Sequence, residues 1–121
     1  MQIGINIAVK GQKNSASTPQ GTAPFVVTAP TLSAYVVCAS PTNDVNILSM
    51  VWGGSPTPVI TYSWYQIDPF GGPDIAIGQY TSTFYNAYAY AETYLYCVIT
   101  ATNSAGVTTV NTPQLYVYDC S

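Results

Sequence analysis

The chain has 121 residues, of which 48% are hydrophobic and only 6% charged, and its formal net charge is −3 at pH 7. This length suits one domain with one core. The two cations, Lys10 and Lys13, stand without any arginine, so the clustered positive charge that holds a nucleic-acid backbone is missing and nucleic acid is not expected as a partner. A surface with so little charge indicates faces that meet other protein subunits, or else a neutral polar β-surface.

The chain opens with MQIGINIAVK, in which apolar residues alternate with polar or small ones at Ile3, Ile5, Ile7 and Val9. Alternation of this kind is typical of a strand with one apolar face. The stretch GQKNSASTPQGTAP that follows is rich in Gly, Ser, Asn and Pro, which indicates a connector. We therefore expect an N-terminal arm and connector over residues 1–24.

Neither a signal peptide nor a membrane span is expected. The opening residues lack a charged region followed by an apolar one, and no stretch approaches about 18 consecutive apolar residues. We therefore expect synthesis in a cytoplasm and no membrane partner.

From residue 25 onwards, clusters of Val, Ile, Thr and Tyr alternate with Pro and Gly punctuation, which is typical of short strands and turns. The pattern predicts strands at 25–28, 31–38, 45–51, 59–67, 74–79, 82–85, 94–102, 107–110 and 114–118. About seven of them are expected to form an all-β sandwich. No helix of useful length is predicted, because the tyrosine-rich stretch 84–96 favours extended structure.

Side chains alternate across a strand, so the strand at 94–102 has two different faces. The apolar face, expected in the core, carries Leu95, Cys97, Ile99 and Ala101. The opposite face and the last predicted strand are expected to form an outward aromatic strip of Tyr94, Tyr96, Tyr116 and Tyr118. Exposed aromatic rings bind sugars and anchor protein interfaces, although cross-strand tyrosine pairs also simply stabilise sheets.

The residues that most enzymes need are missing. The chain has no histidine, the usual general base and metal ligand. Among the carboxylates only Asp68 and Asp74 are close in sequence, and they predict a solvated turn or, less favoured, a calcium site. The cysteines match no zinc pattern. We therefore expect no enzyme activity and no bound cofactor or metal.

Four phrases carry a resemblance: WGGSPTP at 52–58, ITYSWY at 60–65, IGQYTSTF at 77–84 and CVITATNSAG at 97–106. Together they resemble the bacterial and phage Ig-like domains of virion proteins and surface adhesins. The last phrase is similar to their F strand and F–G turn, where Asn and Gly supply the positive φ of a tight hairpin. The resemblance implies an Ig-like β-sandwich over residues 25–121.

The cysteines leave two pairings open. Cys38, Trp52 and Cys97 are spaced much like the Cys, Trp, Cys pattern of antibody-type domains, which bridges Cys38 to Cys97. The phage-type phrases instead favour Trp64 as the central buried indole. In Ig-like folds the first and last strands often run side by side, so Cys38 and Cys120 are the preferred disulfide in an oxidising medium, with Cys97 buried and reduced.

The resemblance implies a non-enzymatic virion structural protein, most simply a capsid decoration or cement subunit that is made in the host cytoplasm. Its partners would be capsid or tail subunits, including further copies of itself on the particle. In this interpretation Ile3, Ile5 and Ile7 add to a sheet edge of a partner, while Lys10 and Lys13 meet an acidic surface. The arm could instead fold back on its own sandwich or remain unstructured.

Two other functions stay open. The tyrosines also suit a carbohydrate-binding adhesin module that contacts a host-surface glycan. The domain could equally be an appendage of a tail or fibre protein, because an Ig-like fold alone hosts unrelated functions.

Overall fold

The computed structural model describes residues 21–120. In chain order the elements are β2 (Thr22–Thr28), β3 (Thr31–Leu32), β4 (Val36–Cys38), β5 (Val45–Leu48), β6 (Val51–Ser55), β7 (Val59–Gln66), β8 (Ile75–Ala76), β9 (Thr83–Phe84), the short 3-10 helix η1 (Ala87–Tyr90), β10 (Thr93–Asn103), β11 (Gly106–Asn111) and β12 (Leu115–Tyr118). No α-helix occurs between residues 21 and 120, so the predicted all-β class is confirmed there. Strand β2 begins at Thr22, slightly before the boundary expected at 25.

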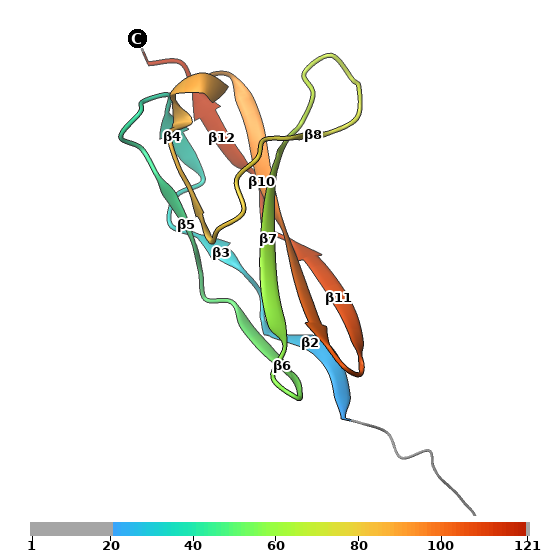
Figure 1. The fold of residues 1–121 in the computed structure, drawn as a ribbon. Helices are drawn as coiled ribbons and strands as arrows, with labels where there is room; N and C mark the ends of the chain where they lie inside the picture. Colours follow the sequence, from blue (N-terminus) through green and yellow to red (C-terminus); the bar gives the residue numbers. More distant parts are fainter. Residues whose placement is uncertain (1–20, 121) are drawn as a thin grey trace, which may run out of the picture.

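The strands form two facing layers, as Figure 1 shows. One layer is a six-stranded sheet in the order β4-β12-β10-β7-β8, with β11 also paired to β10. The other consists of a two-stranded sheet, β2-β6, and a three-stranded sheet, β3-β5-β9. The core draws on both layers, because Leu32 and Val45 from the smaller sheets cluster with Leu95 and Val117 from the large one. This arrangement is consistent with a β-sandwich.

Trp64 lies at the centre of the core. Its side chain is fully buried, opposite Cys97 in the β7–β10 ladder. The indole ring packs 5.5 Å from the ring of Phe84, and its Nε1 donates a hydrogen bond of 2.8 Å to the carbonyl oxygen of Thr81. Trp52 is only half-buried. The central indole is therefore Trp64, as the sequence pattern predicted.

The predicted strand at 31–38 is wrong as a single element. The chain pairs with β5 at β3, leaves the small sheet after Leu32, and joins the edge of the large sheet at β4. There β4 runs parallel to β12, with Val36 opposite Tyr116, whereas the other strand pairs are antiparallel. The strand is divided because its two halves belong to different layers.

Strand β6 corrects a second prediction. The sequence predicts one strand at 45–51 and a turn after it, but β5 ends at Leu48, Ser49 has a positive φ of 61°, and β6 begins at Val51. The glycines of the WGGS phrase lie inside β6. Gly53 pairs with Phe25 of β2, whose ring occupies the space that a Cβ at position 53 would need. Glycine there permits a close approach of the two strands.

The sandwich has two distinct ends. At the proximal end, where the described chain begins, Asn103 donates hydrogen bonds to the carbonyl oxygens of Thr22 (2.8 Å) and Pro56 (3.0 Å). At the distal end lie η1, the loop at 67–74 and the C-terminal residues after β12 (Figure 1). Strand β10 runs from the distal end at Thr93 to the proximal end at Asn103, so the position of a neighbouring residue along the molecule can be given by its partner in β10.

Candidate binding surface

The outer face of the six-stranded sheet carries the predicted aromatic strip. The alternation of β10 buries Leu95 and Cys97 and turns Tyr94 and Tyr96 outward. Tyr94 stands opposite Tyr116 of β12, and two residues later Tyr118 stands on the same face. The structure therefore brings together all four tyrosines singled out from the sequence.

Tyr65 belongs to the same surface and was not singled out from the sequence. It stands opposite Tyr96 in the β7–β10 ladder, and it neighbours the buried Trp64 along β7. Its outward direction follows from that neighbour, because consecutive side chains point to opposite faces. We call the set Tyr65, Tyr94, Tyr96, Tyr116 and Tyr118 the tyrosine face.

The rings of the tyrosine face are arranged in pairs. The ring centroids of Tyr65 and Tyr96 lie 5.8 Å apart with planes inclined by 18°, and those of Tyr94 and Tyr116 lie 4.7 Å apart with planes inclined by 42°. Both separations fall in the range of favourable aromatic pairs. The rings are therefore held in position by one another at the surface.

Each pair is also fixed by a carboxylate. The hydroxyl of Tyr96 donates a short hydrogen bond to Oδ2 of Asp74, and the hydroxyl of Tyr116 donates one of 3.0 Å to Oε1 of Glu92. The bond to Asp74 raises the pKa of Tyr96 to about 12, and the bond to Glu92 raises the pKa of Tyr116. Both hydroxyls therefore remain donors at neutral pH.

Loop structure places the two carboxylates. Asp68 closes the loop before Asp74, because its carboxylate accepts hydrogen bonds from the backbone N–H groups of Phe70 (2.9 Å) and Gly72 (3.0 Å). Glu92 has a positive φ of 63°, and its backbone N–H donates to the carbonyl oxygen of Val117 (2.7 Å). The carboxylate of Asp68 is thus occupied by its own turn, as expected of a hairpin loop. Within residues 21–120 no group of three or more His, Cys, Asp or Glu side chains could hold a metal ion.

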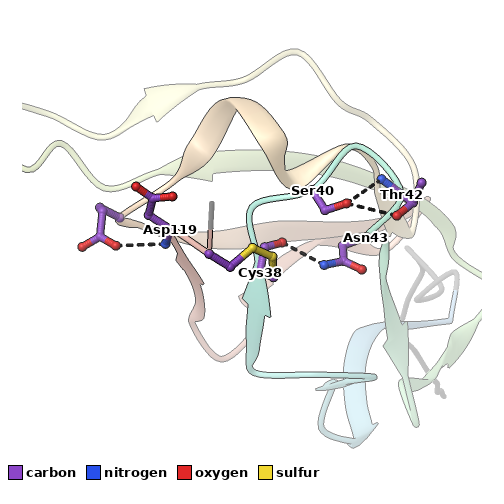
Figure 2. The surroundings of a disulfide bond; sticks show 7 residues. Cys38, Ser40, Thr42, Asn43 and Asp119 are labelled. Carbon is purple, nitrogen blue, oxygen red and sulfur yellow. Dashed lines mark hydrogen bonds between the residues drawn. A yellow bond between two sulfur atoms is a disulfide. The ribbon is translucent and has the colours of Figure 1, made fainter.

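A disulfide ties the distal end. Cys38, at the end of β4, is bonded to Cys120, with the Cα atoms 5.6 Å apart (Figure 2). The side chain of Asn43 donates a hydrogen bond of 2.8 Å to the carbonyl oxygen of Cys38. Cys97 is the free cysteine, and burial raises the pKa of its thiol to about 12. The bridge is therefore between the first and last strands of the large sheet, and the antibody-type bridge to Cys97 is not formed.

Exposed apolar side chains lie on both layers in the half of the molecule that contains β2, β6 and the β10–β11 hairpin. Val59 and Val107 flank Thr102 on the outer face of the large sheet, since both pair with it. On the β2-β6 sheet, Phe25 and Val51 are about half exposed. We call this set, which consists of Phe25, Val27, Val51, Val59 and Val107, the apolar collar. The sequence alone does not mark these residues as a surface, because isolated exposed valines are common in strands.

The remaining predicted site residues lie in the arm. Ile3, Ile5, Ile7, Lys10 and Lys13 all fall outside the described residues. In the part of the chain that the structure describes, no pocket is found and no helix is long and apolar enough to cross a membrane.

No protein-family model, curated protein or solved structure matches this chain. The functional assignment below therefore depends on the chemistry and the placement of its own residues.

Proposed function

We propose that the protein is a non-enzymatic virion structural subunit with an Ig-like fold, attached to capsid or tail subunits by its proximal end. Three features of the fold support the Ig-like assignment: the first strands cross from one layer to the other, β4 runs parallel to the last strand, and a tight hairpin follows the central strand β10. The β10–β11 hairpin contains the CVITATNSAG phrase, which resembles an F strand and F–G turn. The positive φ that the resemblance implied is absent, because neither Asn103 nor Gly106 has one.

The observation that supports the attachment is the exposed apolar surface near the end at which the chain enters the sandwich. Val59 and Val107 flank Thr102 of β10 there, one residue before Asn103, which binds the carbonyl oxygen of Thr22, whereas the tyrosine face lies toward the other end of β10. Exposed apolar surface on a small protein commonly marks an interface. A subunit held at the collar would thus present its tyrosines to the surroundings.

The edge of β6 supplies a second element of the interface. Among the strands that the structure describes, β6 pairs only with β2. Strand β5, which precedes β6 in the chain, has β9 as a neighbour. Strand β9 pairs with Val45 and Asn46 of β5 and does not reach β6. The open edge of β6 contains no charged residue and no proline, the usual protections of an edge strand. A strand from a neighbouring subunit could therefore add there.

Charge is divided between the arm and the body in a way that suits this attachment. Both lysines lie in the first 20 residues, whereas the five carboxylates all lie between residues 21 and 120. In our proposal Lys10 and Lys13 contact an acidic surface of the particle, and Ile3, Ile5 and Ile7 contribute a strand to a partner sheet. Screening by salt should weaken the lysine contribution.

The test uses particle incorporation. Mass spectrometry of purified particles should detect the protein, and deletion of residues 1–20 should abolish incorporation. Val59→Asp combined with Val107→Asp should reduce incorporation by about tenfold or more, the effect of losing interface anchors. The matched control is Val36→Asp, an equally exposed valine at the distal end, which should leave incorporation unchanged.

Thermal melting separates assembly from folding. The collar variants should melt within a few degrees of the wild type, since exposed positions contribute about 0.5 kcal/mol or less. Normal incorporation of the truncated protein, or of the collar variant, would show that the interface lies elsewhere. Immunogold labelling of particles then distinguishes a capsid position from a tail or fibre position.

A further inference from the structure

The tyrosine face contains the same arrangement twice. Two tyrosine rings and one carboxylate form each unit: the first is Tyr65, Tyr96 and Asp74, and the second is Tyr94, Tyr116 and Glu92. The two units are adjacent, because Tyr94 and Tyr96 are two residues apart on one face of β10 and hence about 7 Å apart along the strand. This separation is on the scale of neighbouring rings in an oligosaccharide.

Core packing does not require these units. The core is closed on the other face of β10 by Leu95 and Cys97, both fully buried. Tyr94 is 48% exposed, and Asp74 and Glu92 are exposed as well. Hydrogen bonds between exposed groups contribute little to folding, because water competes for the same donors and acceptors. Ring pairs with fixed carboxylates at the surface are thus better explained by a ligand.

Charge restricts what that ligand can be. The sequence between residues 21 and 120 contains no lysine, arginine or histidine, so a phosphate, sulfate or carboxylate on a ligand would find no cation to pair with. It would instead meet Asp74 and Glu92, and like charges at close range are unfavourable. These charges disfavour an anionic ligand and favour one that donates hydrogen bonds.

A neutral sugar fits both parts of each unit. The negative face of a tyrosine ring attracts the polarised C–H groups on the flat side of a pyranose. A carboxylate accepts hydrogen bonds from sugar hydroxyls, and Oδ1 of Asp74 keeps this capacity, since Tyr96 occupies Oδ2. Both oxygens of Glu92 accept one bond, from Tyr116 and from the backbone N–H of Asp119, and each retains a further lone pair.

We propose that the tyrosine face is a binding site for a neutral oligosaccharide. One pyranose ring contacts Tyr65 and Tyr96 and donates a hydroxyl hydrogen bond to Asp74. The neighbouring ring contacts Tyr94 and Tyr116 and donates to Glu92. This binding site consists of these side chains alone. It is a function additional to the attachment that we propose for the apolar collar. The two surfaces do not compete, because they lie toward opposite ends of β10.

The test begins with a glycan array probed with the full-length chain. The array carries neutral gluco-, galacto- and manno-oligosaccharides, together with sialylated and sulfated versions of the same backbones. We expect binding to one class of neutral oligosaccharide, weakened when a negative group is added. Calorimetry with the best neutral ligand then measures affinity.

Variants locate the site. Tyr96→Ala should weaken binding by about tenfold or more, the size expected for loss of an aromatic anchor. Tyr96→Phe keeps the ring but loses the bond to Asp74, so its loss should be smaller, whereas Asp74→Ala should weaken binding without removing a ring. The control is Tyr80→Ala, which removes an exposed tyrosine outside the tyrosine face.

Each outcome decides the proposal. Binding that falls with Tyr96→Ala and Asp74→Ala but not with Tyr80→Ala, in variants that remain folded at the temperature of the binding assay, supports it. Absence of binding to every neutral oligosaccharide at millimolar concentration overturns it, as does selective binding of the acidic versions. Unchanged affinity in Tyr96→Ala also overturns it, whatever happens to particle incorporation, so the result is independent of the collar.

Discussion

The two ends of this small sandwich are stabilised in different ways. At the distal end, a disulfide, two ring pairs and carboxylate hydrogen bonds fix the surface. In the proximal half, β2 and β6 form a two-stranded sheet with an open edge, and the exposed side chains of the apolar collar are four valines and Phe25. Directional bonds hold a surface in one shape before any partner arrives, whereas aliphatic surface is stabilised only when it is covered.

The difference suggests that the two ends of β10 have different roles, with ligand binding toward the distal end and assembly at the proximal end. Substitutions toward the distal end should change the stability or the ligand affinity of the isolated protein. Substitutions in the apolar collar should change assembly and leave the isolated protein nearly unaltered. Variants at each end, and in the core that connects the two ends, test this contrast.

Replacement of Trp64 should have the largest effect. Trp64→Ala removes the central indole and its bond to Thr81, so we expect the free energy of unfolding to fall by about 3 to 5 kcal/mol. Urea unfolding followed by circular dichroism measures it. The comparison variant is Trp52→Ala, a half-buried indole on the proximal side, which should cost less. Equal losses would mean that the core is not centred on Trp64.

Removal of the disulfide should have the second-largest effect on the free energy of unfolding. Cys38→Ala combined with Cys120→Ala opens a loop with a sequence separation of 82, and a disulfide typically contributes about 2 to 4 kcal/mol to the free energy of unfolding. Reductant should destabilise the wild type by the same amount and the double variant not at all. Cys97→Ala serves as the control, because it should retain the full response to reductant. If Cys97→Ala abolished that response, the pairing would be wrong.

Asn103 links the strands at the proximal end. Its amide donates to the carbonyl oxygens of Thr22 and Pro56, and its Oδ1 accepts from the backbone N–H of Ala105 (2.9 Å). Asn103→Ala should therefore lower the free energy of unfolding by about 1 to 2 kcal/mol. Asn111→Ala, at an exposed position of β11, should cost much less. Hydrogen exchange should show faster opening of β2 than of β12 in Asn103→Ala.

The smallest effect concerns alkaline pH. The hydrogen bond to Asp74 raises the pKa of Tyr96 to about 12, above the ordinary value of about 10. The folded state therefore holds this proton more tightly than the unfolded state. The resulting stabilisation is complete below about pH 10 and is lost between about pH 10 and 12.

Tyr96→Phe lacks this contribution, so the difference in stability between wild type and Tyr96→Phe should shrink over that pH window. Denaturant titrations at pH 8, about 10 and about 11.5 measure the difference. A constant difference for Tyr96→Phe would show that the bond to Asp74 does not form in solution.

Local pattern was enough to predict the central strand and its faces. The alternation around Cys97 predicted both the buried row and the outward tyrosines, because a strand with one buried face must alternate. The burial of Trp64 was predicted differently, from the resemblance of the phrases around it to Ig-like domains. These features depend on neighbouring residues, which a single sequence displays directly.

Two features that depend on distant residues were not predicted, although the disulfide between Cys38 and Cys120 was. Strand β6 exists because Gly53 pairs with Phe25, and its glycines alone favour a turn. Likewise, the residues that fix the tyrosine rings come from loops, since Asp74 is 22 residues from Tyr96 and Glu92 is 24 from Tyr116. Tertiary pairing overrides local preference at these positions.

The bond between Cys38 and Cys120 also determines how the molecule would respond to pulling. It closes the chain from β4 to the end of the sheet into a covalent ring, and among the described strands β2 and β3 precede that ring. Tension applied through the N-terminus would peel β2 and β3 and then stop at Cys38. The tyrosine face lies inside the ring. Under such tension the segment before Cys38 would extend, while the residues of the tyrosine face stay within the closed ring.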